Sequence, residues 1–227
     1  MPKIGMEPLR RFQIIRAVVE SVADQGLESL TMEIVAKRAN VSKGVVNYYF
    51  AGKRDMLLQS FDAFLESYYQ QIAEMIQPDT TAEEMLTIVI AVCFPDKDVA
   101  LPLWKYDPKI DVDNLPDIGN DPTYSINRLG KVLVHFLSKT ISDNDFQSIY
   151  LKVYNAYLDG MKIIIQHGIA SGEFREVDHE KAALSIMALI EGMVLYRNVS
   201  FHPLTPQEYR AVCLQFARRY LANNDSS

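Results

Sequence analysis

The sequence predicts an all-α protein in which an N-terminal domain of three short helices precedes a larger helical domain. Apolar residues recur at three- to four-residue spacing through most of the chain, which is the period of an amphipathic helix. No segment keeps the period of two that a half-buried strand requires. With 227 residues, 48% of them hydrophobic, the chain can bury an extensive core. We expect the first domain to span residues 1–52 and the second residues 53–227.

Four helices are expected in the first third of the chain. Residues 7–24 carry apolar side chains at helical spacing, and Gly26 is placed to end that helix. The stretch "TMEIVAKRA" predicts a second, short helix, and "SKGVVNYYF" predicts a third. A fourth helix is expected from Lys53 to about Ile76, where the apolar residues form a broad stripe.

The remaining helices are marked by signals at their ends. Thr81 with Glu84 forms a capping box before "MLTIVIAVCF". Residues 95–122 hold five prolines and seven aspartates, which predicts a long loop or a broken helix. Helices are then expected at about 123–140, 143–171, 178–198 and 206–221. Their end signals are a capping box of Ser142 with Asp145, a stop at Gly172, and the N-terminal cap Thr205, Pro206 and Glu208.

The charge of the chain is unevenly distributed. The net charge is −6, but residues 1–60 contain nine Lys and Arg against six Asp and Glu, a surplus of about +3. The rest of the chain is strongly acidic. A mildly basic first domain on an acidic body indicates a module that binds a polyanion, although ordinary fluctuation in composition is the alternative.

Nothing in the sequence indicates catalysis or a metal. Cys93 and Cys213 are far apart in apolar surroundings, as expected for reduced core residues. The histidines form no ligand pattern, and there is no nucleophile–base pair or phosphate-binding loop. We therefore expect no enzyme, no cofactor and no metal. The opening "MPKIGMEPLRRF" has no apolar core of a signal peptide, and the longest apolar runs are too short for a membrane span, so we expect a cytoplasmic protein.

The third helix has two different faces. On a helical wheel, its two valines and Tyr49 fall on the side expected to pack inward. The opposite side presents an ammonium, a residue without a side chain, an amide and an aromatic ring: Lys43, Gly44, Asn47 and Tyr48. This combination is suited to the major groove of DNA, whereas the simpler alternative is a solvated polar face.

The second helix makes the DNA interpretation stronger. It has a narrow face of small apolar residues for close packing, formed by Met32, Val35, Ala36 and Ala39. The short turn "NVS" follows, with Asn40 where a left-handed residue is needed and Ser42 as the N-cap of the third helix. Two short helices joined in this way predict a helix-turn-helix.

These residues resemble a known family. The stretch "GLESLTMEIVAKRANVSKGVVNYYFAGKRDML" is similar to the DNA-binding region of TetR-family transcriptional regulators. The start "MPKIGMEPLRR" also resembles that of the BetI-like, choline-responsive branch. The resemblance implies a ligand-responsive regulator, a repressor in the first instance, which binds a palindromic DNA operator as a homodimer and is released by a small-molecule effector.

The resemblance also implies roles for single residues. The hydroxyls of Thr31 and Tyr49 and the ammonium of Lys53 would bind phosphates, although the ring of Tyr49 has an alternative role in the core. Asn47 stands where many members carry an aromatic residue, so its contact with the operator can differ. The full expected DNA-binding set is Thr31, Ser42, Lys43, Gly44, Asn47, Tyr48, Tyr49 and Lys53.

The second domain resembles the family mostly in architecture. Residues 168–197 look like the pair of helices that contact the same pair of a second subunit. The expected dimer stripe is Ala182, Ala183, Met187, Ile190 and Val194, with an internal core helix as the alternative.

Aromatic residues of the second domain are candidates for the effector pocket. They are Trp104, Tyr106, Tyr124, Phe136, Tyr154 and Tyr157, with Asp107 or Asp111 nearby in sequence. Aromatic rings beside carboxylates would suit an organic cation, although the alternative is that the rings are core and the aspartates solvate a loop. The competing function is an interaction protein that keeps the helix-turn-helix but does not read DNA.

Overall fold

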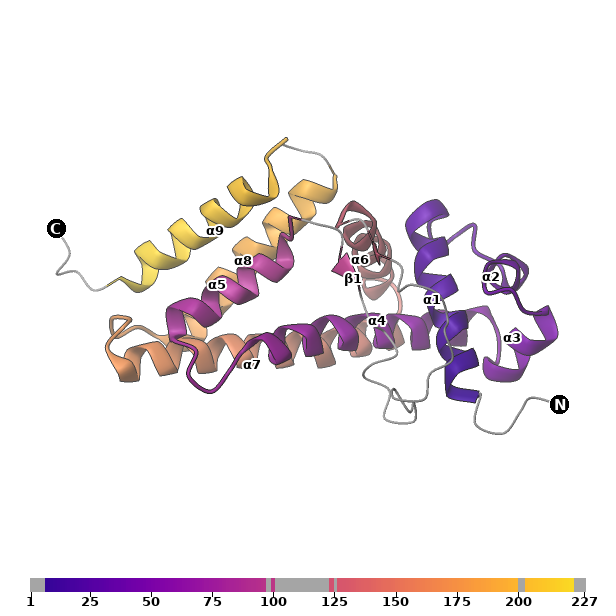
Figure 1. Cartoon of the computed structure of the whole chain (residues 1–227), viewed down its shortest axis with the longest axis horizontal. Coiled ribbons are helices and arrows are strands. Elements are labelled where there is room, and N and C mark those ends of the chain that lie inside the picture. The colour runs from indigo at the N-terminus through magenta and orange to yellow at the C-terminus, as the bar shows by residue number, and fades with distance from the viewer. Residues whose placement is uncertain (1–6, 97–98, 101–122, 125, 200–202, 223–227) are drawn as a thin grey trace. The chain divides into compact units, whose positions relative to one another are not determined.

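The computed structural model describes residues 7–96, 99–100, 123–124, 126–199 and 203–222 (Figure 1). The described helices are α1 (Glu7–Gln25), α2 (Met32–Arg38), α3 (Lys43–Tyr49), α4 (Lys53–Met75), α5 (Ala82–Cys93), α6 (Ile126–Thr140), α7 (Asn144–Ser171), α8 (His179–Asn198) and α9 (Pro206–Leu221). The all-α class is therefore confirmed. No helix in these ranges combines the length and the apolar character that crossing a membrane requires.

A short pair of strands is the one departure from the expected class. Strand β1 (Val99–Ala100) pairs antiparallel with β2 (Thr123–Tyr124), so that the strands flank most of the segment rich in proline and aspartate. Two-residue strands carry too little sequence to show a period of two, which is why the pattern did not predict them. The expectation of a long loop at 95–122 lies mostly outside the described residues.

The chain divides into two compact units. The first contains residues 1–70 and 98–151, and the second contains residues 71–97 and 152–227. Helices α4 and α7 each begin in the first unit and end in the second. The three short helices thus share a unit with α6, and the domain border expected after residue 52 stays a prediction.

The first unit is organised around α1, which lies between α2 and α6 (Figure 1). Ile14, Val18 and Val22 of α1 are completely buried. A stack of aromatic rings joins the other helices of this unit: the ring of Phe61 from α4 lies 4.6 Å from that of Phe136 in α6 and 5.9 Å from that of Phe146 in α7. Helix α2 packs on α1 of this unit, and α3 packs on α2.

Two turns of the first unit bear on helix ends predicted from the sequence, one at Gly26 and one before α7. Gly26 has φ of 77°, a conformation that favours glycine, and a Cβ there would lie only 3.0 Å from the His135 ring. The capping box of Ser142 with Asp145 is wrong. Helix α7 begins at Asn144, and the carboxylate of Asp143 accepts hydrogen bonds from the amides of Asp145 (3.0 Å) and Phe146 (3.5 Å). The acid next to the serine takes the capping position.

The second unit packs α5, α8 and α9 side by side, with the end of α7 in the same core (Figure 1). Leu86, Ile90 and Ile186 are completely buried, and the rings of Phe94 and Tyr209 stack at 5.4 Å. The capping boxes at Thr81 and Thr205 are confirmed, with both partner bonds present in each.

Candidate nucleic-acid interface

The turn between α2 and α3 has the geometry of a helix-turn-helix. Asn40 adopts φ of 52°, as predicted, and the amide of Val41 donates to the carbonyl of Ala36 at 2.9 Å. The hydroxyl of Thr31 accepts from the Ile34 amide at 3.2 Å, and that of Ser42 accepts from the Val45 amide at 3.3 Å. Both short helices are thus fixed at their N-terminal ends. The sequence predicted the cap at Ser42, whereas the cap at Thr31 is shown by the structure alone.

Helix α3 presents the outward face that the wheel predicted. Val46 is completely buried and Val45 and Tyr49 are half-buried, which anchors the helix to the unit. Tyr48 is 64% exposed, an unusual state for a tyrosine on a short helix of a packed domain. The exposed side consists of Lys43, Gly44, Asn47 and Tyr48, so the structure brings the four predicted groove residues together on one surface.

The two tyrosines and the glycine of α3 have distinct environments. The Tyr49 ring packs edge-on against the Tyr48 ring, with 5.1 Å between centroids and 88° between planes. Tyr49 is half-buried and its hydroxyl oxygen is buried, so it belongs partly to the core, as its alternative role suggested. A Cβ on Gly44 would meet only the Ser42 hydroxyl at 3.7 Å. The fold itself does not need glycine there.

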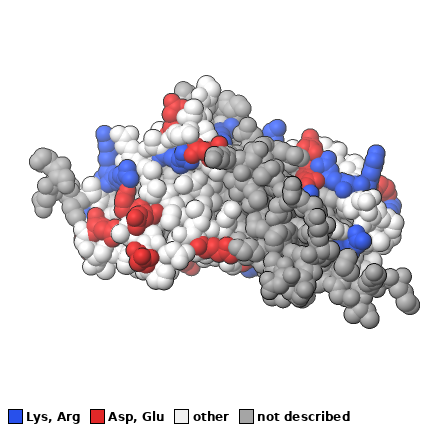
Figure 2. Space-filling model, in the orientation of Figure 1, with Lys and Arg blue, Asp and Glu red and all other residues white. Residues whose placement is uncertain are grey.

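The cations of this region are engaged with acceptors that the sequence did not reveal. Lys43 pairs with Glu33 of α2, and Lys53 donates to the backbone carbonyl of Glu28 at 3.1 Å. Arg54 binds both Asp143 (2.8 Å) and Asp145 (2.7 Å) at the start of α7. Basic and acidic side chains lie next to one another on the visible face of this region (Figure 2).

The residues predicted for the dimer stripe are mostly inside the second unit. Ala182, Ala183, Met187 and Ile190 are buried in its core, and Val194 is half-buried. The exposed apolar side chains of α8 and α9 are instead Leu184, Leu195, Tyr196, Val212 and Phe216. Helix α8 is apolar on both sides, so spacing alone did not tell which stripe faces the core.

The predicted effector residues are not gathered in one place by the described structure. Trp104 and Tyr106, with Asp107 and Asp111, lie outside the described residues, and Tyr124 is described only as part of β2. Phe136 is completely buried in the ring stack of the first unit. Tyr154 and Tyr157 are half-buried on α7 in the second unit.

Tyr154 is affected by both burial and a nearby negative charge. Burial and, secondly, the negative charge of Glu191 on α8 raise the pKa of the Tyr154 hydroxyl above its ordinary value. Glu191 was not singled out in the sequence, because a charge interrupting an apolar run carries no information about the ring it faces.

Comparison with known proteins connects both parts of the chain with described families. Residues 14–59 match the family described as "Bacterial regulatory proteins, tetR family", and residues 120–222 match "BetI-type transcriptional repressor, C-terminal". The chain is 26% identical over 231 residues to the HTH-type transcriptional regulator BetI of Cronobacter sakazakii, which covers 98% of this chain and 96% of that protein. It is 46% identical over 72 residues to BetI 1 of Chromohalobacter salexigens, which covers 32% of either chain.

Solved structures share the fold over nearly the whole chain. A transcriptional regulator from Saccharomonospora viridis in complex with choline superimposes with a TM-score of 0.77 at 15% identity, covering 94% of this chain and 98% of that one. The regulator FadR from Bacillus subtilis in complex with stearoyl-CoA has a TM-score of 0.68 at 23% identity, covering 91% and 96%. At these identities the likeness establishes the fold alone.

Proposed function

Because the chain belongs to the TetR family of bacterial regulatory proteins and carries a BetI-type C-terminal part, it is a transcriptional regulator, and we propose that it acts as a ligand-released repressor. In this proposal a homodimer binds a palindromic operator through α3 of each subunit. A small effector that binds the second unit favours a spacing of the two helices that does not match the half-sites. The family consists of regulators, so no catalytic role is proposed.

The observation that carries the proposal is the exposed face of α3. Lys43 and Asn47 supply the donors and acceptors that base edges and phosphates bind, and Tyr48 supplies an aromatic surface. One such helix contacts only a few base pairs, so two heads one helical turn apart are needed to read a palindrome. Thr31 and Lys53 are proposed to bind the adjacent phosphates, and Ser42 to hold the start of α3 in place. Tyr49 is proposed to support α3 from the packed side, because its hydroxyl oxygen is buried.

The proposed dimer uses the exposed apolar side chains of α8 and α9. These neighbouring helices contact one another within the subunit, and both leave large apolar groups uncovered. Leu184 is 52% exposed and Phe216 is 41% exposed. Apolar groups on two adjacent helices are suited to a four-helix contact with the same pair of a second copy.

Replacing Phe216 by glutamate is expected to dissociate this dimer. A carboxylate buried without a partner costs about 3 kcal/mol or more, so the dimer Kd should rise at least about 100-fold. Sedimentation velocity over a concentration series measures the change. Ile163→Glu is the matched control, because Ile163 is a 63% exposed apolar residue of α7 outside α8 and α9. Dissociation by both variants, or by neither, would contradict the proposed interface.

The proposed effector is an organic cation. The support is the charge of Glu191 acting on Tyr154, together with the BetI-type match and a structural neighbour that was solved with choline. Choline, betaine aldehyde and related quaternary amines are therefore the first compounds to test. The neighbour that holds stearoyl-CoA shows that the same fold also accommodates other ligands.

The function is tested by operator release. We expect the protein to bind the duplex upstream of its own gene more tightly than a random duplex, and choline or a related cation to weaken only the first complex. Glu191→Gln should raise the effector concentration needed for release about three- to tenfold, because it removes a charge but keeps the shape. Electrophoretic shift and fluorescence anisotropy provide the measurements.

The control separates the effector from the operator. Glu191→Gln without effector should bind the operator as the natural protein does. Failure of any upstream duplex to compete better than random DNA would favour the alternative, an interaction protein that keeps the helix-turn-helix without reading sequence. Release by a fatty acyl thioester but not by any cation would retain the repressor and remove the cation site.

A further inference from the structure

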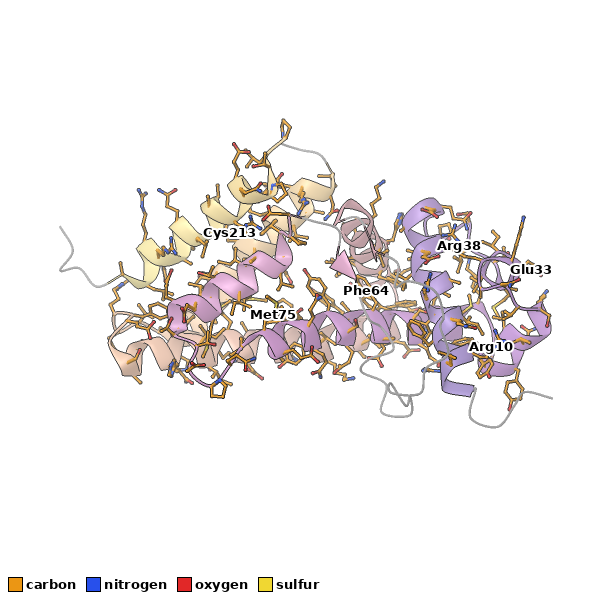
Figure 3. All side chains as sticks on the ribbon, viewed as in Figure 1. Arg10, Glu33, Arg38, Phe64, Met75 and Cys213 are labelled. Atoms are coloured by element: carbon orange, nitrogen blue, oxygen red, sulfur yellow. The ribbon has the colours of Figure 1, made fainter. Side chains whose placement is uncertain are left out.

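The two helices of the helix-turn-helix are joined by an exposed ion pair. Glu33 is the second residue of α2 and Lys43 is the first residue of α3, and the Lys43 ammonium contacts a carboxylate oxygen of Glu33. The side chains are 54% exposed for Lys43 and 60% exposed for Glu33. Figure 3 shows Glu33 on α2, in the part of the first unit that carries α3. A negative charge thus lies beside Lys43, which begins the exposed face of α3 that is proposed to contact DNA.

Glu33 contacts more than one group proposed to face DNA. Its pKa lies below the ordinary value, first because of the hydrogen bond from Lys43 and then because of one from its own backbone amide. A hydrogen bond with the Thr31 hydroxyl adds to the effect. The carboxylate is therefore ionised at neutral pH, and it is bound to the same lysine and the same threonine that the proposed function assigns to the DNA.

Three other cations of this region have partners away from α3, and one of them, Arg54, pairs with Asp143 and Asp145 at the start of α7. Arg38 forms ion pairs with Glu20 and Asp24 of α1, within the body of the unit (Figure 3). Lys53 donates to a backbone carbonyl. If Lys53 moved to a phosphate, it would therefore leave no unpaired negative charge at that position. Lys43 is the cation on the exposed face of α3, and the carboxylate of Glu33 offsets its charge.

We propose that Glu33 competes with DNA for the Lys43 ammonium and thereby limits the affinity of the protein for any duplex and the salt dependence of that affinity. The inference rests on the proposed DNA-binding function and adds to it a residue that contributes no favourable contact of its own. To bind a phosphate or a base edge, Lys43 has to leave Glu33. The freed carboxylate then lies close to the phosphates, where its charge is repelled.

Salt dependence follows from the same competition. A lysine that neutralises one phosphate releases a condensed cation from the DNA, which contributes about 0.9 to the slope of log K against log salt. When that lysine leaves a carboxylate, the carboxylate takes up a cation from solution, which offsets part of the release. Without the carboxylate the slope should be steeper, by up to about 0.9 for each head in contact with DNA.

Glu33→Gln tests the proposal, since it removes the charge and keeps the size of the side chain. We expect Glu33→Gln to bind a random duplex about three- to tenfold more tightly than the natural protein, with a steeper salt slope between about 50 and 200 mM salt. Glu176→Gln is the control for net charge, because Glu176 is an exposed carboxylate of the second unit, and it should leave both quantities unchanged. Fluorescence anisotropy of a labelled duplex is the measurement.

A double-mutant cycle shows whether Glu33 acts through Lys43. In a Lys43→Gln background, adding Glu33→Gln should change the affinity for random duplex by less than about twofold, because the competition has been removed. If the full gain persists in that background, the carboxylate acts only by general repulsion and the proposal is wrong. Weaker binding by Glu33→Gln would also overturn it, since Glu33 would then make a favourable contact with DNA.

These outcomes are distinct from failure of the proposed function. An affinity gain for random duplex, with no preference for an upstream sequence, would overturn the repressor function and retain the role of Glu33. Specific operator binding without the gain would do the reverse, and absence of binding to any duplex by either protein would overturn both. NMR titration of the free protein adds an independent readout: the pKa of Glu33 should rise toward its ordinary value in Lys43→Gln.

Discussion

Replacing Lys43 and Tyr48 together by alanine is expected to weaken operator binding at least about 100-fold while the protein stays folded. Two lost contacts to bases or phosphates in each of the two subunits, at about 1–3 kcal/mol each, account for that loss. Both side chains point away from the packed side of α3, and Tyr48 is 64% exposed. Their removal leaves no cavity, and the exposed ion pair of Lys43 with Glu33 contributes little to stability.

The measurement is a pair of titrations on the same preparation. Fluorescence anisotropy with the operator duplex gives the change in Kd, and thermal unfolding shows that Tm changes by no more than a few degrees. Lys152→Ala is the control for loss of one exposed positive charge, because Lys152 is exposed on α7 and belongs to the second unit, not to the helix-turn-helix. Retained operator binding by the double variant would show that the outward face of α3 is not the reading surface.

The helix-turn-helix could be predicted because its sequence signals are local. Asn40 in the left-handed turn, the cap at Ser42 and the two faces of α3 each depend on residues within one helical turn of one another. Wheel geometry converts such spacing directly into exposure. For this reason the burial of Val46 and the exposure of Tyr48 followed from the sequence alone.

The contacts around the head could not be predicted because they join distant residues. Arg54 and Asp143 are 89 positions apart, and no pattern in either segment refers to the other. The same reason explains the second unit, where both stripes of α8 are apolar and only packing decides that Ala183 is inside and Leu184 outside. Ser142 and Asp143 are both good N-cap residues and are adjacent in sequence. The sequence pattern therefore could not show that Asp143 caps α7.

Phe136 shows how a side chain changes role once its neighbours are known. Its sequence context allowed an effector contact, yet in the first unit its ring stacks on Phe61 at 4.6 Å and lies 6.2 Å from the Phe146 ring. The ring is completely buried and forms part of the contact among α4, α6 and α7. We therefore expect a substitution of Phe136 to change the stability of the protein more than its ligand binding.

Phe136→Ala is accordingly expected to lower the free energy of unfolding by about 3–5 kcal/mol, since it leaves a cavity the size of a ring in a packed core. For a chain of this length the change corresponds to a Tm lower by about 6–20 °C. Phe136→Leu keeps most of the apolar volume and should lose less than half as much. Thermal and denaturant unfolding of the three proteins provide the comparison.

The effector response discriminates between the two roles of this ring. If Phe136 is core, the thermal stabilisation by a bound cation should persist in Phe136→Leu at a temperature where that variant is folded, whereas Glu191→Gln should reduce it with no comparable loss of Tm. The opposite pattern, an unchanged Tm for Phe136→Ala with a lost effector response, would return the ring to the ligand site. Burial within a stack of three rings makes the first pattern the expected one, because a side chain with aromatic neighbours 4.6 and 6.2 Å away has little surface left for a ligand.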